Sequence, residues 1–140
     1  MKTETVAETK QPISTAASND WIDRYVAAQN QALLSVPNAV VGDIIALVRR
    51  AGAEGRRIFV CGNGGNASNA AHFATDLGKG ASERSPRPFK VLSLADNVAW
   101  MTAIGNDYSF DDLFVRQLGN HAEPGDVVIL SSVSGSSPTI

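Results

Sequence analysis

The sequence contains very little cysteine and no long apolar run. Cys61 is the only cysteine among the 140 residues, which excludes an intrachain disulfide and a cysteine-based zinc cluster. No apolar stretch approaches the ~18 residues of a membrane span. The start, Met1-Lys2-Thr3-Glu4, lacks the basic and then apolar profile of a signal peptide. We therefore expect a cytoplasmic protein without a membrane partner.

Neither positive nor negative charge is in clear excess. Twelve Lys and Arg side chains stand against fourteen Asp and Glu, which leaves a net charge of −2. Domains that bind nucleic acid usually carry a clear basic excess, so we expect no nucleic-acid partner. A length of 140 residues, with 44% hydrophobic and 19% charged residues, is typical of one globular domain. These values favour a small molecule as the partner.

The N-terminal part predicts an arm followed by a helical pair. Residues 1–18 are polar and have neither helical nor strand periodicity, which indicates a flexible arm. Asn19-Asp20 can cap a helix that ends before Pro37. A second helix with a wide apolar face is predicted from Asn38 to a stop at Gly52 to Gly55. We expect residues 19–140 to be the N-terminal part of a single domain.

The rest of the chain alternates between strand and helix patterns. The short apolar run at 58–61, flanked by glycine, predicts a strand that is buried on both faces, and two further strands are predicted at 89–94 and 127–130. Helices are predicted between them, at 67–77, 98–104 and 110–121, with a surface loop at 82–88 and a break at Gly105-Asn106-Asp107. This order predicts an α/β fold with a parallel sheet and right-handed crossovers. A parallel sheet that stopped after the third strand would keep an open edge, so we expect a domain truncated there.

Two loops follow predicted strands and favour an anion site. They are Gly62 to Asn66 after the first strand and Ser131 to Ser137 after the third. Ligands of parallel sheets bind at the carboxyl ends of the strands, and free N–H groups at helix N-termini favour phosphate. Each loop alone is equally well interpreted as a tight turn before a capped helix. The glycine spacing fits neither the Rossmann fingerprint nor the P-loop.

Other polar residues have both a functional and a structural interpretation. His72 and Asp76 are four residues apart on one helix face, which suits a metal pair or an acid/base pair, although this spacing more often forms a surface hydrogen bond. Asn106-Asp107 could reach a polyol substrate or form a turn and helix cap. His121 is expected at a helix C-terminus with no catalytic role. Cys61 is expected to be buried and inert.

Four motifs in order resemble the SIS (sugar isomerase) domain, and within it the phosphoheptose isomerase family, also called sedoheptulose 7-phosphate isomerases. The resemblance covers about Trp21 to Ile140 and rests on these runs: Cys61-Gly-Asn-Gly-Gly-Asn-Ala-Ser, Ala71-His72-Phe73-Ala74-Thr75-Asp76-Leu77, Gly105-Asn106-Asp107-Tyr108-Ser109-Phe110, and Gly125-Asp126-Val127 leading to Ser132-Val133-Ser134-Gly135-Ser136-Ser137.

The resemblance implies a fold, an assembly and a reaction. The fold is an αβα sandwich with a parallel, flavodoxin-like sheet, and the assembly is a homotetramer with sites at subunit interfaces. The reaction converts sedoheptulose 7-phosphate to a heptose 7-phosphate for bacterial surface heptoses through an enediolate. By resemblance, His72 and Asp76 bind zinc, and Asp76 is also the catalytic base. The substrate-binding positions implied are Asn63, Gly64, Gly65, Asn66, Asn106, Asp107, Ser132, Val133, Ser134 and Ser137.

Three departures from the family accompany the resemblance. Asp76 replaces a Glu, and the loss of one methylene moves the carboxylate by about 1.5 Å. Asn66 stands where Ser is usual but still offers a donor. The family's C-terminal segment, with a partner His and further zinc ligands, is expected beyond Ile140. These departures keep an alternative open: a non-catalytic SIS module that senses a phosphosugar, or a scaffold like the relatives that associate with the initiator DnaA.

Overall fold

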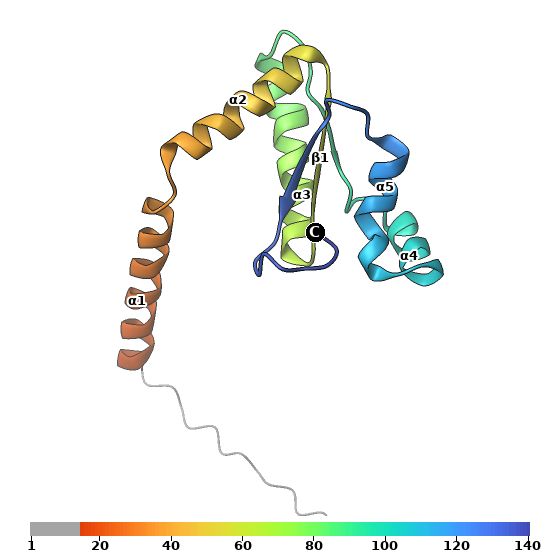
Figure 1. Cartoon of the computed structure of the whole chain (residues 1–140). Coiled ribbons are helices and arrows are strands. Elements are labelled where there is room, and N and C mark those ends of the chain that lie inside the picture. The colour runs from red at the N-terminus through yellow and green to blue at the C-terminus, as the bar shows by residue number, and fades with distance from the viewer. Residues whose placement is uncertain (1–14) are drawn as a thin grey trace, which may run out of the picture. The chain divides into compact units, whose positions relative to one another are not determined.

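The computed structural model describes residues 15–140, with only the backbone of Ala16 and Ala17. Residues 1–14, most of the predicted arm, lie outside the described residues. The chain divides into two compact units, one ending at Gly42 and the other running from Asp43 to Ile140 (Figure 1).

The first unit contains helix α1, Thr15–Leu34. Because the helix begins at Thr15, residues 15–18 are helical and not part of an arm, and Asn19 is not its cap. On its surface, Arg24 Nη2 lies 2.8 Å from Asp20 Oδ2, and these two exposed residues are one helical turn apart. The helix ends where Ser35 Oγ donates to the Ala32 carbonyl at 2.7 Å, just before Pro37.

Helix α2, Asn38–Glu54, begins where the sequence predicted and leads into the second unit. It continues through Gly52 and stops at Gly55, whose φ of 70° is left-handed and favours glycine. Gly52 is required by packing, since a Cβ there would lie 2.4 Å from the ring of Phe89. No single helix among residues 15–140 is long and apolar enough to cross a membrane; α1 and α2 satisfy length and composition only when taken together as a bent pair.

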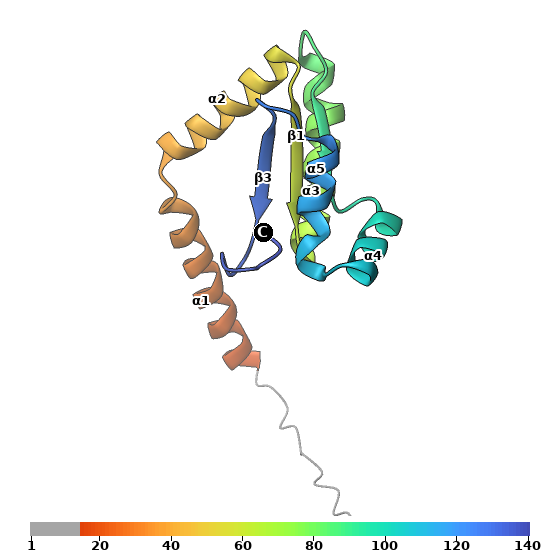
Figure 2. The ribbon, with the colours of Figure 1, turned by 45° about the vertical axis from the view of Figure 1, so that its right-hand side comes forward.

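The centre of the second unit is a parallel sheet, as predicted (Figure 2). Its strands are β1 (Arg57–Gly62), β2 (Lys90–Ser93) and β3 (Val127–Ser131), in the order β2-β1-β3. Phe59 of β1 is in register with Leu92 on one side and Val128 on the other. This order begins the flavodoxin-like arrangement, in which the first strand lies between the second and third.

Helices connect the strands. The connection from β1 to β2 contains α3 (Gly65–Thr75), a π-helical turn η1 (Asp76–Ala81) and a 3₁₀ turn η2 (Ser82–Arg84). The connection from β2 to β3 contains α4 (Val98–Asp107), a 3₁₀ turn η3 (Phe110–Asp112) and α5 (Leu113–His121). The predicted helix at 67–77 is therefore divided at Asp76, where the backbone changes from α to π winding.

One expected break is wrong. Gly105-Asn106-Asp107 completes α4 and does not interrupt it. Ile104, 3% exposed, anchors this last turn in the core, and the N–H of Tyr108 donates to the Ile104 carbonyl at 2.9 Å. The start was predicted correctly, since the Asn97 side chain caps α4 by accepting from the N–H of Trp100 at 3.0 Å.

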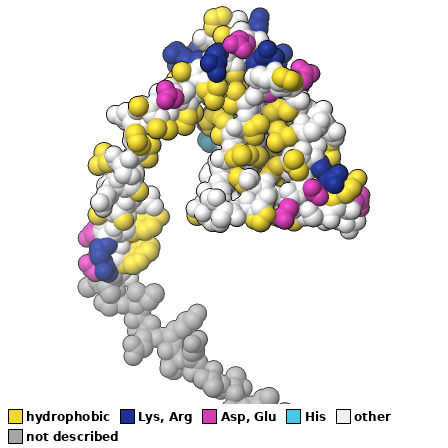
Figure 3. Space-filling model, viewed as in Figure 1, with side chains coloured by type: hydrophobic (Ala, Val, Ile, Leu, Met, Phe, Trp, Pro, Cys, Tyr) yellow, Lys and Arg dark blue, Asp and Glu magenta, His cyan; other side chains and the backbone are white. Residues whose placement is uncertain are grey.

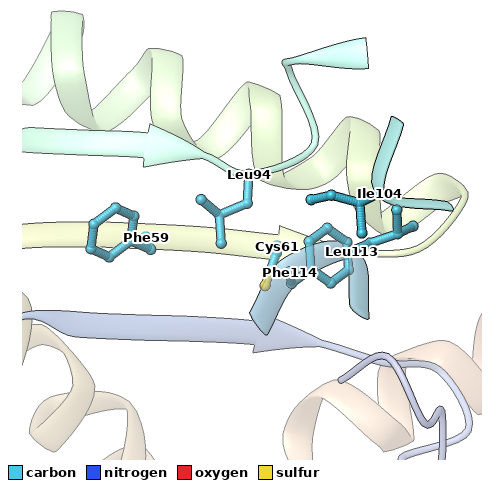
Figure 4. Close-up of a cluster of buried hydrophobic side chains, with 6 residues drawn as sticks. All are labelled: Phe59, Cys61, Leu94, Ile104, Leu113 and Phe114. Atoms are coloured by element: carbon cyan, nitrogen blue, oxygen red, sulfur yellow. The ribbon is translucent and has the colours of Figure 1, made fainter. Parts of the chain in front are cut away.

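The sheet has an apolar core on each face, which gives the αβα sandwich. Phe59 and Cys61 pack with Leu94 and the helices α4 and α5 (Figure 4). Ile58 and Val60 point the other way and pack against α2 and α3. Since successive strand residues face opposite sides, the continuous apolar run of β1 supplies both cores.

Candidate functional site

The glycine loop after β1 is shaped by close backbone packing. A Cβ on Gly62 would lie 2.9 Å from the Ser131 carbonyl oxygen and 2.5 Å from Asn66 Cβ, so only glycine lets β3 and the first turn of α3 approach. Gly64 precedes α3 with a φ of 55°. The N–H groups of Asn66 and Ala67 in the first turn donate to the Asn63 and Gly64 carbonyls, both at 3.0 Å. The N–H groups before them, at Gly64 and Gly65, are therefore the candidates for contact with an anion.

The serine loop after β3 is folded by its own hydroxyls. Ser132 Oγ accepts from the N–H of Gly135 at 3.0 Å, and Ser134 Oγ accepts from the N–H of Ser136 at 3.3 Å. Gly135 turns the loop with a φ of 67°. Val133 is 97% exposed, so its apolar side chain takes no part in the core. The loop therefore presents hydroxyls and backbone donors on a narrow turn.

The two loops meet at Asn63. Its Nδ2 donates to Ser137 Oγ and to Thr139 Oγ1, both at 3.0 Å, across more than seventy residues of sequence. Ser137 Oγ and Thr139 Oγ1 are also 3.3 Å apart. Thr139 is buried and was missed from the sequence, although a hydroxyl residue right after a serine-rich loop is a usable signal. The carboxyl ends of β1 and β3 thus share one network of neutral amide and hydroxyl groups.

The network contains no charged side chain. Residues 62–66 and 131–137 consist of glycine, asparagine, serine and one valine. Any attraction for an anion therefore comes from the helix terminus and from N–H and O–H donors, which hold a phosphate by geometry and not by net charge.

His72 and Asp76 form a pair at the C-terminal end of α3. His72 Nε2 lies 3.2 Å from Asp76 Oδ2, with the side chains 79% and 70% exposed. Imidazole nitrogen and carboxylate oxygen are suitable zinc donors, but protein zinc sites use three or four. No cluster of three or more His, Cys, Asp or Glu occurs within residues 15–140. The described part of this chain therefore supplies two ligands at most.

Asn106 and Asp107 form a hydrogen-bonded pair of their own. Asn106 Nδ2 donates to Asp107 Oδ1 at 2.8 Å, and both residues are exposed at the end of α4. The described hydrogen bonds of these side chains link the pair internally and not to either loop. The described contacts therefore connect the predicted site residues as the joined loops and two separate exposed pairs.

Two titratable groups on the sheet have structural roles. Burial raises the pKa of the Cys61 thiol to about 11, so this cysteine is buried and inert as predicted. Burial would also raise the pKa of Asp126, but the N–H donors of Arg57 and Glu123 and the cations of Arg57 and Arg56 lower it. The Asp126 carboxylate accepts these two N–H groups at 2.8 and 2.9 Å and fixes the start of β3 beside β1.

Two grooves lie elsewhere, along β2. The larger, 390 Å³, is lined by Trp100, Gln117 and His121 among others, and the smaller, 280 Å³, reaches Arg57 and Lys90. Neither includes an expected site residue. His121 ends α5 as predicted, and its ring meets the Trp100 ring edge-on at 5.2 Å.

The fold and the loops define the class. The SIS domain family model matches residues 20–140, so this chain belongs to the SIS domain family.

Its relatives are more particular. The chain is 44% identical over 87 residues to a phosphoheptose isomerase of Rhodospirillum rubrum, covering 61% of this chain and 45% of the relative. It is 39% identical over 112 residues to that of Bordetella avium, covering 80% and 55%. The chain thus spans about half the length of these curated relatives.

Solved structures agree. A phosphoheptose isomerase from Francisella tularensis superposes with a TM-score of 0.76 at 29% identity, covering 87% of this chain and 65% of that one. The phosphoheptose isomerase from Neisseria gonorrhoeae superposes with a TM-score of 0.68 at 29% identity, covering 89% of this chain and 62% of that one. Both support the α/β fold of the SIS family.

Proposed function

We propose that this chain is part of a phosphosugar aldose–ketose isomerase that converts sedoheptulose 7-phosphate to a heptose 7-phosphate. The observation that carries the proposal is the double hydrogen bond of Asn63, which joins the glycine and serine loops into one anion-binding edge. The names of the relatives support the reaction. The product would serve the biosynthesis of bacterial surface heptoses in the cytoplasm.

The proposed phosphate site uses the joined loops. Ser132, Ser134 and Ser137 offer hydroxyls, and the backbone of Val133 and the Gly64-Gly65 turn offer N–H groups. Asn63 and Asn66 border this turn. Ser132 Oγ and Ser134 Oγ each accept an N–H within the loop and lie 3.4 Å apart, so one hydroxyl can donate to the other while the second keeps its proton for a phosphate.

The proposed chemistry moves one proton. The isomerisation removes a proton from C1 of the ketose and delivers it to C2 through an enediolate, while the hydroxyl and carbonyl exchange places. Asp76 takes the role of base, and Asn106 and Asp107 hold the sugar hydroxyls. Because the described contacts join these residues to neither loop, we propose that neighbouring subunits complete the site.

A homotetramer would supply those neighbours. Helix α1 exposes apolar side chains at helical spacing, including Trp21 and Tyr25, whose rings stack at 5.3 Å. Leu33 is 74% exposed on the same helix. An amphipathic helix with an exposed apolar face favours association. Sedimentation should report a tetramer that Leu33→Asp dissociates and that Val115→Asp, at an exposed position of α5, leaves intact.

Zinc is proposed with His72 and Asp76 as two of its ligands. A bound zinc ion would polarise the substrate carbonyl. The sequence contains only two histidines, His72 and His121, which gives a matched control. We expect His72→Ala to weaken zinc binding in calorimetry and His121→Ala to leave it unchanged. If the two variants weaken zinc binding equally, or not at all, His72 and Asp76 form only a surface hydrogen bond.

The function is tested by turnover and binding together. We expect the full-length enzyme to convert sedoheptulose 7-phosphate and these 140 residues alone to be inactive. Ser134→Ala in the full-length enzyme should lose about 1–3 kcal/mol of phosphosugar binding while its circular dichroism is kept. Binding without turnover would favour a sensor, and absence of both would remove the phosphate site from the account.

A further inference from the structure

The cations of the second unit gather at one end. Eight of its nine Lys and Arg residues come from the end of α2, the start of β1 and the segment leading into β2: Arg49, Arg50, Arg56, Arg57, Lys79, Arg84, Arg87 and Lys90. Figure 3 shows dark blue side chains around the end of α2. Only Glu54, Glu83, Glu123 and Asp126 accompany them. We call these eight residues the basic end.

Two of the eight cations pair with acidic groups, and a third, Arg87, donates from Nη1 to the Ala53 carbonyl at 3.4 Å. Arg56 Nη1 donates to the Pro124 carbonyl at 3.0 Å, and Arg57 lies 3.5 Å from Glu123 and 3.9 Å from Asp126. The other six have no ion-pair partner among residues 15–140 and are exposed. Internal pairing therefore does not account for the basic end.

The phosphosugar loops do not account for it either. The basic end lies where the strands start, and the loops lie where they finish. The six residues of β1 separate the two edges by about 20 Å. Charges are screened over about 8 Å at physiological salt, so the six exposed cations contribute little at the loops.

The basic end borders an apolar groove. The 280 Å³ groove has Phe59, Phe89 and Leu92 in its lining, with Arg57 and Lys90 beside them. Leu92 is 45% exposed. Apolar lining next to Lys90, which has no ion-pair partner among residues 15–140, matches an acidic segment that carries an apolar side chain.

We propose that the basic end and this groove dock an acidic protein segment with one aromatic or aliphatic anchor residue. The cations attract the acidic side chains, and the anchor lies over Leu92 and Phe89. This interaction uses neither loop, so it is independent of the proposed isomerase activity.

The test is anisotropy of a labelled, Glu-rich peptide of about twelve residues with a central Phe, added to the full chain. We expect binding that weakens as salt rises from about 50 to about 300 mM, as ionic contacts require. The double variant Arg84→Glu and Lys90→Glu should lose about tenfold or more in affinity. Arg24→Glu on α1 is the matched charge control and should bind as the wild type.

A second set of measurements tests the groove. Replacing the peptide's Phe with Ala should weaken binding to wild type, and Leu92→Asn should remove that difference while keeping the salt dependence. Absence of peptide binding, indifference to the double variant, or equally tight binding of duplex DNA or anionic vesicles would overturn the proposal. Circular dichroism of each variant separates these results from loss of fold.

Discussion

The two edges of the same sheet are held together by different chemistry. Where the strands start, the Asp126 carboxylate accepts two N–H groups, and Arg56 and Arg57 lie beside acidic groups and carbonyls. Where the strands finish, Asn63 joins the loops through neutral hydroxyls. The charged edge fixes the strands, and the neutral edge keeps its remaining donors free. The proposed anion site therefore lies on an edge whose two loops contain no cation.

The largest effect is expected at Gly62. Gly62→Ala should destabilise the fold by about 3 kcal/mol, because the added Cβ meets a backbone oxygen that cannot move aside cheaply. Thermal or urea unfolding measures this. Gly65→Ala is the control, since nothing lies within 4 Å of a Cβ there. Equal stability of the two variants would contradict the close approach of the loops.

The charged edge should respond to pH. Because the pKa of Asp126 is lowered in the folded state, its stabilising contribution is present above the ordinary Asp pKa and is lost as pH falls through the folded pKa. Asp126→Asn should cost about 2 kcal/mol near neutral pH, and this difference should shrink on acidification. Urea melts at several pH values measure it. A constant difference would show that the carboxylate is not charged in this role.

The neutral edge should respond least in stability and most in binding. Asn63→Ala removes two part-buried neutral hydrogen bonds and should cost only about 1 kcal/mol of folding free energy. Its affinity for sugar phosphates should fall because the loops separate. Calorimetry with a sugar phosphate checks this, with Asp126→Asn as the control that keeps the loops. Unchanged affinity of Asn63→Ala for sugar phosphates would show that the joining of the two loops is not needed for binding.

Sequence patterns predicted the parts of the fold that depend on local rules. The apolar runs marked the three strands within one or two residues, and the start of α4 at Val98 was predicted correctly. Tertiary packing decided the rest. Because Ile104 is buried in the core, α4 continues through Gly105 to Asp107. No sequence pattern indicated the π-helical turn that begins at Asp76.

The site was predictable as two loops but not as a network. Glycine after β1 and serine after β3 implied a shared edge, since parallel strands end together. The role of Thr139 depends on the path of the last residues, which spacing does not reveal. The net charge of −2 concealed the basic end, because acidic residues elsewhere cancel it in the total.

The most direct measurement is a backbone NMR titration of the protein with a sugar phosphate. If the two loops form one phosphate site, the amide chemical shifts of Gly64, Gly65, Ser134 and Gly135 should change together with one dissociation constant. The amide chemical shifts of Arg84 and Arg87 should stay unchanged. Shifts confined to one loop, or shifts at the basic end in place of the loops, would contradict a single phosphate site built by the neutral edge.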